Sequence, residues 1–236
     1  MASETIWHGD GREQALLKHI LNHPNASELR GRPDSILSEI DRWALKHNLC
    51  MMTIGPDRSQ PIIDVIRSTT PKTMAELGGY IGYSAIKFAS EIRKTTTTTT
   101  AGIARYLSLE SDVQYASVAQ ALVEFAGLAD LVHIHVGSSA ESLAKLAAEG
   151  VEIDVLFIDH NEDLYVRDLR LAEKYALLHL GSVVVADNVG GPRARDYVQM
   201  VTKNEGGAAG FKYRSRTLPY VLPDGQQDAV LITNLV

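Results

Sequence analysis

The chain has 236 residues, of which 45% are hydrophobic and 22% charged, so a sizeable hydrophobic core is expected. Its formal net charge is −6 and its basic residues are scattered, which excludes the basic stripe that a nucleic-acid-binding protein needs. Its one cysteine, Cys50, excludes an intramolecular disulfide and a cysteine metal cluster.

The sequence also lacks the marks of an exported or membrane protein. Its first residues do not follow the basic-then-apolar order of a signal peptide, and no apolar run reaches the roughly 20 residues that span a bilayer. We therefore expect a cytoplasmic protein with neither a membrane nor a nucleic acid as partner. The length fits one α/β domain over residues 1–236.

Residues 1–70 are predicted to be mostly helical. Apolar residues recur every three or four positions in residues 11–24, 33–48 and 62–70, which is the period of an amphipathic helix. Pro33 stands where a first-turn proline is favoured, and a short loop at residues 25–32 joins the first two helices. We expect these helices to form a cover over a core made by residues 71–236.

From residue 71 onward, predicted strands alternate with predicted helices. Strand patterns at residues 73–80, 105–110, 131–137, 153–159 and 182–188 are separated by helical patterns at 84–94, 113–127, 139–150 and 165–179. This alternation favours a parallel sheet with both faces covered. A helix at 192–206 precedes strands at 211–220 and 227–235, whose connecting turn predicts an antiparallel hairpin. The threonine run at 95–100 predicts a surface loop.

The stretch AELGGYIGYS, residues 75–84, reads as a strand, a glycine turn and the start of a helix. Gly78, Gly79 and Gly82 form a variant of the dinucleotide-binding fingerprint, in which glycines let the backbone turn tightly and a ligand approach it. A tight turn without a ligand gives the same pattern. Glu76, interpreted as part of this turn, disfavours a pyrophosphate and favours a ligand with an ammonium group.

Two further strand ends support a nucleoside site beside this turn. Glu110 ends the second strand, where an acidic side chain commonly accepts hydrogen bonds from ribose hydroxyls. The third strand ends at Gly137, followed by Ser138 and Ser139. Because ligands bind at the carboxyl ends of parallel strands, these loops predict a nucleoside with an amino-acid tail as the ligand.

Acidic residues also follow the fourth and fifth predicted strands. Asp159 follows one strand, and Asp187 and Asn188 follow the next, so their side chains are expected at the same edge of the sheet. Two carboxylates and an amide oxygen are hard ligands that suit Mg²⁺. For each acid alone, a helix cap or a solvated turn is the competing interpretation, and His160 alone is more often structural than a ligand.

Taken in order and spacing, ELGGYIGYS, LSLE, VGSS, FIDH and ADN resemble the catechol O-methyltransferase family of S-adenosylmethionine- and Mg²⁺-dependent enzymes. The resemblance runs from about Gly11 to the C-terminus and includes MTIG at residues 52–55. It implies a Rossmann-like class I methyltransferase with a seven-stranded, mostly parallel sheet, an antiparallel C-terminal hairpin and an N-terminal helical cover. The implied reaction transfers the sulfonium methyl group to one oxygen of a Mg²⁺-chelated catechol.

The resemblance also implies which residues hold each group. The methionine part of the donor would lie against five residues: Ile54, Glu76, Gly78, Tyr80 and Ser84. Glu110 would hold the ribose, while Ser139 and His160 would contact the adenosine. Mg²⁺ would be held by Asp159, Asp187 and Asn188, with Asp159 also lying beside the donor.

The sequence departs from the family on the acceptor side. The family has Asp-His-Trp-Lys, with the lysine as general base, where this chain has Asn161 and Glu162 in the last two places. Pro219 stands where the family has a glutamate that holds the other acceptor hydroxyl. Cys50 stands where relatives often have a tryptophan against the substrate ring.

Three interpretations of these departures stay open. Glu162 takes over as base or as an extra metal ligand, or a more polar mouth formed by Asn161 and Glu162 accepts a cationic or hydroxyl-rich acceptor. In the third, transfer is weak or lost, and the protein binds a ligand or partner or catalyses a non-methylating reaction. We expect a small-molecule acceptor, an aromatic vicinal diol, and a monomer or homodimer.

Overall fold

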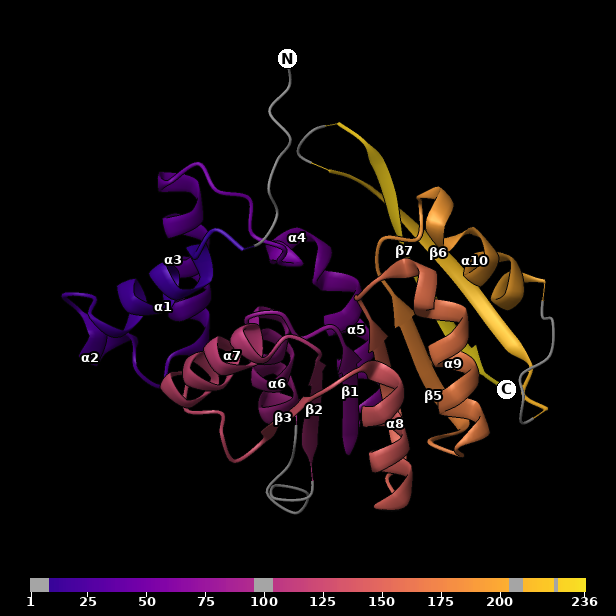
Figure 1. The fold of residues 1–236 in the computed structure, drawn as a ribbon. Coiled ribbons are helices and arrows are strands. Elements are labelled where there is room, and N and C mark those ends of the chain that lie inside the picture. The colour runs from indigo at the N-terminus through magenta and orange to yellow at the C-terminus, as the bar shows by residue number, and fades with distance from the viewer. Residues whose placement is uncertain (1–8, 96–103, 204–209, 223–224) are drawn as a thin grey trace.

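A central seven-stranded sheet organises the protein, and its strand order is β3-β2-β1-β4-β5-β7-β6 (Figure 1). The computed structural model describes residues 9–95, 104–203, 210–222 and 225–236. The five strands from β3 to β5 are parallel, and β7 runs antiparallel to both β5 and β6. The predicted mostly parallel sheet with a reversed C-terminal hairpin is confirmed.

The strands alternate with helices up to β5, as predicted. The strands are β1 (Thr73–Leu77), β2 (Arg105–Glu110), β3 (Val132–Val136), β4 (Ile153–Ile158), β5 (Leu178–Ala186), β6 (Tyr213–Val221) and β7 (Gln227–Leu235). The α-helices are α1 (Arg12–Leu21), α2 (Ala26–Leu29), α3 (Pro33–Lys46), α4 (Gly55–Arg58), α5 (Gln60–Thr69), α6 (Tyr83–Thr95), α7 (Val113–Phe125), α8 (Ser139–Ala148), α9 (Tyr165–Lys174) and α10 (Arg195–Thr202). Two short 3₁₀ helices are η1 (Glu162–Leu164) and η2 (Pro192–Ala194).

The sheet is buried on both faces because successive side chains of a strand point to opposite sides. In β4, Val155 and Phe157 pack into one hydrophobic cluster, and Leu156 and Ile158 pack into the other. The first cluster lies under the N-terminal helices, α6 and α7, where Phe88 meets the ring of Phe157 at 5.5 Å. The second lies under α8, α9 and α10.

The N-terminal helices pack beside α6 and α7 (Figure 1). Helix α1 contacts α3 and α7, while α3 and α5 contact α6, so the first part of the chain is anchored on the helices that follow β1 and β2. Among the described residues, no helix combines the length and apolarity needed to cross a bilayer. The predicted boundary near residue 70 falls between α5 and β1, and the single-domain organisation stays a prediction.

Several element boundaries differ from the predictions. The loop expected at residues 25–32 contains α2, and α4 was not predicted. The helix expected to reach residue 179 ends at Lys174 because Ala176 adopts a left-handed φ of 54°, and β5 begins at Leu178. Apolar pairs such as Leu177 and Leu178 suit a helix or a strand equally well. The predicted threonine loop lies largely outside the described residues.

Candidate active site

The candidate site is formed where four parallel strands end side by side. Strand β1 lies between β2 and β4, with Leu77 opposite Leu109 and Ile158, and β4 in turn pairs Ile158 with Ala186 of β5. The residues that follow these partners therefore share one edge of the sheet. They include Gly78 after β1, Asp159 after β4 and Asp187 after β5, with Glu110 as the last residue of β2.

Glu76 is a fully buried carboxylate beneath this edge. It lies within β1 and not in the glycine turn, which corrects the prediction. Its oxygens accept hydrogen bonds from the hydroxyls of Ser84 at 2.6 Å, Tyr106 at 2.6 Å and Ser108 at 2.5 Å. Burial raises the pKa of Glu76 to about 7, although these donors oppose the rise.

The turn after β1 requires glycine for steric reasons. Gly78 has a φ of +98°, and a Cβ atom there would lie 2.4 Å from the backbone oxygen of Asp159. A Cβ atom at Gly79 would lie 2.3 Å from Oγ of Ser108, which is itself bonded to Glu76. The turn thus brings β1 against the end of β4, and this close packing explains the glycines whether or not a ligand binds.

Tyr80 and Glu110 join the glycine turn to β2. The backbone nitrogen of Tyr80 donates to Glu110 Oε2 at 2.7 Å, and the nitrogen of Asp112 donates to Glu110 Oε1 at 2.8 Å. The Tyr80 hydroxyl donates to Glu13 Oε1 of α1 at 2.6 Å. Ile54 is buried in the same hydrophobic cluster as Tyr80. The N-terminal cover is therefore bonded directly to the turn.

A second buried carboxylate, Asp168, brings Ser139 and His160 together. Its Oδ2 lies 2.6 Å from Ser139 Oγ and 2.6 Å from His160 Nε2, and Arg167 donates to its Oδ1 at 2.7 Å. Burial alone would raise the pKa of Asp168, but hydrogen bonds from His160, Arg167 and Ser139 outweigh it and lower the pKa to about 2. Tyr165 stacks on the His160 ring at 5.4 Å.

His160 retains one unused polar atom. Its Nδ1 is buried and makes no hydrogen bond with any part of the chain that the structure describes. A buried polar atom without a partner is costly, so a ligand group that bonds to Nδ1 would recover free energy. The buried Nδ1 atom of His160 therefore fits a polar ligand such as adenosine.

Asp159, Asp187 and Asn188 meet at the ends of β4 and β5. Burial and the charge of Asp187 hold the pKa of Asp159 well above its usual value. Burial also raises the pKa of Asp187, against the opposing charge of Arg58. Asn188 turns the chain with a left-handed φ of 54°, and its Nδ2 donates to Asp228 Oδ2 at 3.0 Å. The two carboxylates therefore influence each other's side of the site, and the assignment of all three residues to a metal stays a prediction.

Arg58 and Tyr220 also reach this acidic pair, and neither was predicted. Arg58, the last residue of α4, donates from Nη1 to Asp187 Oδ2 at 2.9 Å and from Nη2 to the Thr53 oxygen at 2.6 Å. Tyr220 of β6 donates its hydroxyl to Asp187 Oδ1 at 2.8 Å. No local motif marks these residues, because each lies far from Asp187 in the sequence and meets it only in the fold.

The loops after β4 and β5 form a charged mouth beside the acids. Arg193 of η2 lies 3.0 Å from Glu162 and 3.1 Å from Asp163 of η1, and also contacts Asn161. Arg193 therefore joins the two loops. Pro219 is exposed on β6 and lies opposite Ala229, so it offers no polar group there.

A parallel sheet of this order, with a glycine turn after its first strand and an acid at the end of the second, defines α/β proteins that bind a nucleoside cofactor at the strand ends. A profile of the O-methyltransferase family matches residues 27–191. Catechol O-methyltransferase of Bos taurus is 35% identical over 198 residues, which cover 83% of this chain and 68% of that protein. Its counterpart in Mus musculus is 33% identical over 227 residues, which cover 94% of this chain and 79% of that protein.

The solved O-methyltransferase TomG of Streptomyces achromogenes, in complex with SAM, matches the whole fold. Its TM-score is 0.69 at 20% identity, and the match covers 100% of both chains. The chain belongs to the O-methyltransferase family and is a methyltransferase.

Proposed function

We propose that this protein transfers a methyl group from S-adenosylmethionine to an oxygen of a small catechol-like molecule, with Mg²⁺ bound at the acceptor side. The main support for the proposal is that a buried carboxylate suited to the donor and a set of acidic residues suited to a metal lie at the same edge of the sheet. A buried carboxylate under a glycine turn, Glu76, suits the ammonium of the donor. Asp159, Asp187 and Asn188 supply hard oxygens at the adjacent strand ends.

On this proposal, the donor lies along the ends of β1, β2 and β4. Glu76 and Ser84 hold its methionine part beside Gly78, Tyr80 and Ile54. The Glu110 carboxylate turns toward the ribose, since it already ends β2 next to the turn. Ser139 and His160 contact the adenosine, which gives the buried Nδ1 of His160 a partner.

The acidic residues fit Mg²⁺ by chemistry and by charge. Carboxylate and amide oxygens are its usual protein ligands. Burial raises the pKa of both Asp159 and Asp187, and the charge of Asp187 raises the pKa of Asp159 further, so a divalent cation would favour the charged form of both acids. When bound, the ion would acidify an acceptor hydroxyl. Arg58 and Tyr220 hold the Asp187 carboxylate in place.

The charged mouth favours a changed acceptor over a simple replacement of the base. Glu162 stands at the family's lysine position, but its carboxylate already pairs with Arg193 at 3.0 Å. We therefore assign Glu162 and Asn161 to the polar rim that selects the acceptor, and an aromatic vicinal diol with a polar or cationic substituent fits that rim. The second candidate function, a different reaction in the same donor and metal pocket, rests on this departure. A cytoplasmic location and a monomeric or homodimeric state stay predictions.

Methyl transfer from labelled S-adenosylmethionine to a panel of catechols tests the proposal, in Mg²⁺ and in chelator. We expect metal-dependent turnover that is lost in Asp159→Ala and retained in Asp196→Ala, which removes an exposed acid of α10. Glu162→Lys reports on the acceptor: recovery of catechol turnover only in this variant would indicate a mouth tuned to another acceptor. No catechol turnover in either the parent or Glu162→Lys would contradict catechol methylation and favour a different reaction in the same pocket.

A further inference from the structure

Two histidines and a buried glutamate meet in the N-terminal cover, away from the strand ends. His19 lies in α1 and His23 lies just beyond the end of that helix, and their two rings meet edge to face at 5.4 Å. Glu39 of α3 is only 4% exposed, and its Oε1 lies 2.8 Å from Nε2 of His19 and 3.6 Å from Nε2 of His23. We propose that these three side chains bind a zinc ion that joins α1 to α3.

The distances suit a tetrahedral zinc site. Zinc bonds of 2.0–2.1 Å to nitrogen and oxygen place neighbouring ligand atoms about 3.3 Å apart. The two measured separations lie on either side of that value, and all three ligand atoms lie within 4.8 Å of one another. Shifts well under the length of a side chain therefore bring Nε2 of both histidines and Oε1 of Glu39 around one ion.

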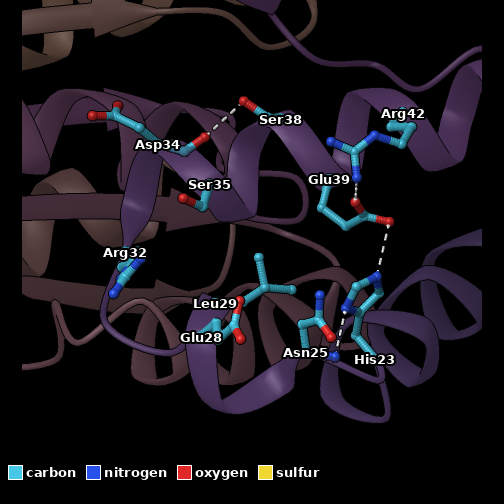
Figure 2. Close-up of a pocket in the computed structure, with 10 residues that line it drawn as sticks. All are labelled: His23, Asn25, Glu28, Leu29, Arg32, Asp34, Ser35, Ser38, Glu39 and Arg42. Carbon is cyan, nitrogen blue, oxygen red and sulfur yellow. Dashed lines mark hydrogen bonds and ion pairs between the residues drawn. The ribbon is translucent and has the colours of Figure 1, made fainter.

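The two carboxylate oxygens of Glu39 have different partners. Arg42, three residues further along α3, contacts Oε2 of Glu39, whereas Oε1 faces both imidazoles. Figure 2 shows Glu39 between Arg42 and His23. An arginine that holds the outer oxygen of a ligating carboxylate fixes its orientation, as outer groups commonly do around metal ligands.

An open pocket of about 380 Å³ borders two of the three side chains, His23 and Glu39, and is also lined by Arg42 and by residues between Asn25 and Ser38 (Figure 2). Water from this pocket can complete the fourth position, which is the usual arrangement when a protein supplies two histidines and one carboxylate to zinc. Imidazole ligands favour zinc over Mg²⁺, which prefers oxygen. The site therefore differs in chemistry from the acids at the strand ends.

Two existing contacts oppose the ion. His19 Nε2 already makes a hydrogen bond with Glu39 Oε1 at 2.8 Å, and this bond must break when both atoms bind zinc. The backbone nitrogen of Asn25 donates to Nδ1 of His23 at 3.1 Å, so the neutral ring carries its proton on Nε2, the atom that zinc needs. Binding requires the proton on Nδ1 in place of Nε2, which displaces the Asn25 contact. That contact is a single exposed hydrogen bond, whose net worth is small beside a metal–imidazole bond. The turn after α1 must therefore adjust when zinc binds.

A zinc ion here would stiffen the cover over the donor turn. Helix α1 also carries Glu13, which accepts the hydrogen bond from Tyr80 at 2.6 Å. Tying the end of α1 to α3 restrains the helix that holds Tyr80. Neither the donor site nor the acceptor site supplies a ligand, so zinc binding and methyl transfer can be measured separately.

Zinc titration of the untagged full-length protein against a chromophoric chelator tests the site. Cys50→Ser in every sample removes the exposed thiol as a competing ligand, and excess Mg²⁺ occupies the acids at the strand ends. His19→Gln and His23→Gln are compared with His133→Gln, which removes an exposed histidine of β3. Glu39→Gln is added with circular dichroism as a check of folding, because Glu39 is buried.

We expect one zinc ion per chain, at least tenfold weaker binding in His19→Gln and in His23→Gln, and unchanged binding in His133→Gln. Zinc at about 100 times the Kd of the parent should raise the Tm of the parent by about 5 °C, and that of the two variants by at most about half as much. Absence of stoichiometric zinc in the parent, or equal affinity in the parent and both histidine variants, would overturn the proposal.

Discussion

The guanidinium of Arg58 donates to the buried carboxylate of Asp187 at 2.9 Å, which places a cation of the N-terminal cover inside the acidic pair at the strand ends. The same side chain bonds to the Thr53 oxygen at 2.6 Å and lies over the ring of Tyr220. The cover, β5 and β6 thus meet at one ion pair. Because Asp187 is fully buried, this charge is only weakly screened by solvent.

Arg58 and a divalent ion at the proposed metal site would compete for the same carboxylate, so we expect Arg58→Met to tighten Mn²⁺ binding by about tenfold. Removing the fixed cation leaves the repulsion between Asp159 and Asp187 to be relieved by the metal alone. Isothermal titration of Mn²⁺ into the protein measures the affinity. Arg58→Lys keeps the charge and should stay close to the parent. Weaker binding in Arg58→Met would mean that Arg58 positions Asp187 for the metal and does not compete with it.

The pKa of Glu76 predicts how stability and donor binding change with pH. The folded protein raises this pKa from 4.5 to about 7, so it holds a proton that the unfolded chain releases. Stability from this group is therefore fully present below pH 4.5 and is lost as the pH rises to about 7. The shift corresponds to about 3 kcal/mol. In Glu76→Gln, the free energy of unfolding in urea should lose this part of its pH dependence, and an unchanged pH profile would contradict the raised pKa.

The same ionisation should control the donor. An ammonium binds best to a charged carboxylate, so S-adenosylmethionine affinity should rise as the pH increases through about 7. Calorimetric titrations between pH 6 and pH 8 measure this rise in affinity. In Glu76→Gln, the rise should be absent and the affinity at pH 8 should be at least tenfold weaker than in the parent. Asp64→Asn, an exposed acid of α5, serves as the control. A rise in affinity that persists in Glu76→Gln would assign it to another group.

The glycine turn predicts a sharp difference between two glycines that both have positive φ. Gly78→Ala forces a Cβ atom to within 2.4 Å of the Asp159 backbone oxygen, whereas Gly150, with a φ of +68°, has open space around it. Urea unfolding should show a loss of about 1 kcal/mol for Gly150→Ala from the backbone alone. Gly78→Ala should lose about 3 kcal/mol or more because overpacking adds to that cost. An equal loss of unfolding free energy in Gly78→Ala and Gly150→Ala would show that the backbone after β4 moves freely to make room for the added Cβ atom.

The sequence sufficed for the fold and for the acids at the strand ends, because both follow from local patterns. Alternating hydrophobic runs predicted the strands, and parallel strands bring their carboxyl ends together, so Asp159 and Asp187 could be placed side by side. Local patterns contain no information about partners that meet only in three dimensions. Arg58 reaches Asp187 across 129 positions, and Asp168 was missed because nothing near it in the sequence marks the end of β3 as its neighbour.

Arg193 sets the charge of the acceptor mouth, where it pairs with Glu162 at 3.0 Å and Asp163 at 3.1 Å. Arg193→Gln leaves both carboxylates without this cation, so the mouth becomes more negative. The KM for an amine-bearing catechol should fall about threefold and the KM for a carboxylate-bearing catechol should rise by a similar factor, a modest change because the pairs are partly exposed. Initial rates with the two acceptors measure the effect, and the matched control is Arg195→Gln, which removes the exposed arginine that begins α10. Equal changes for both acceptors would show that Arg193 shapes the loops without selecting the acceptor by charge.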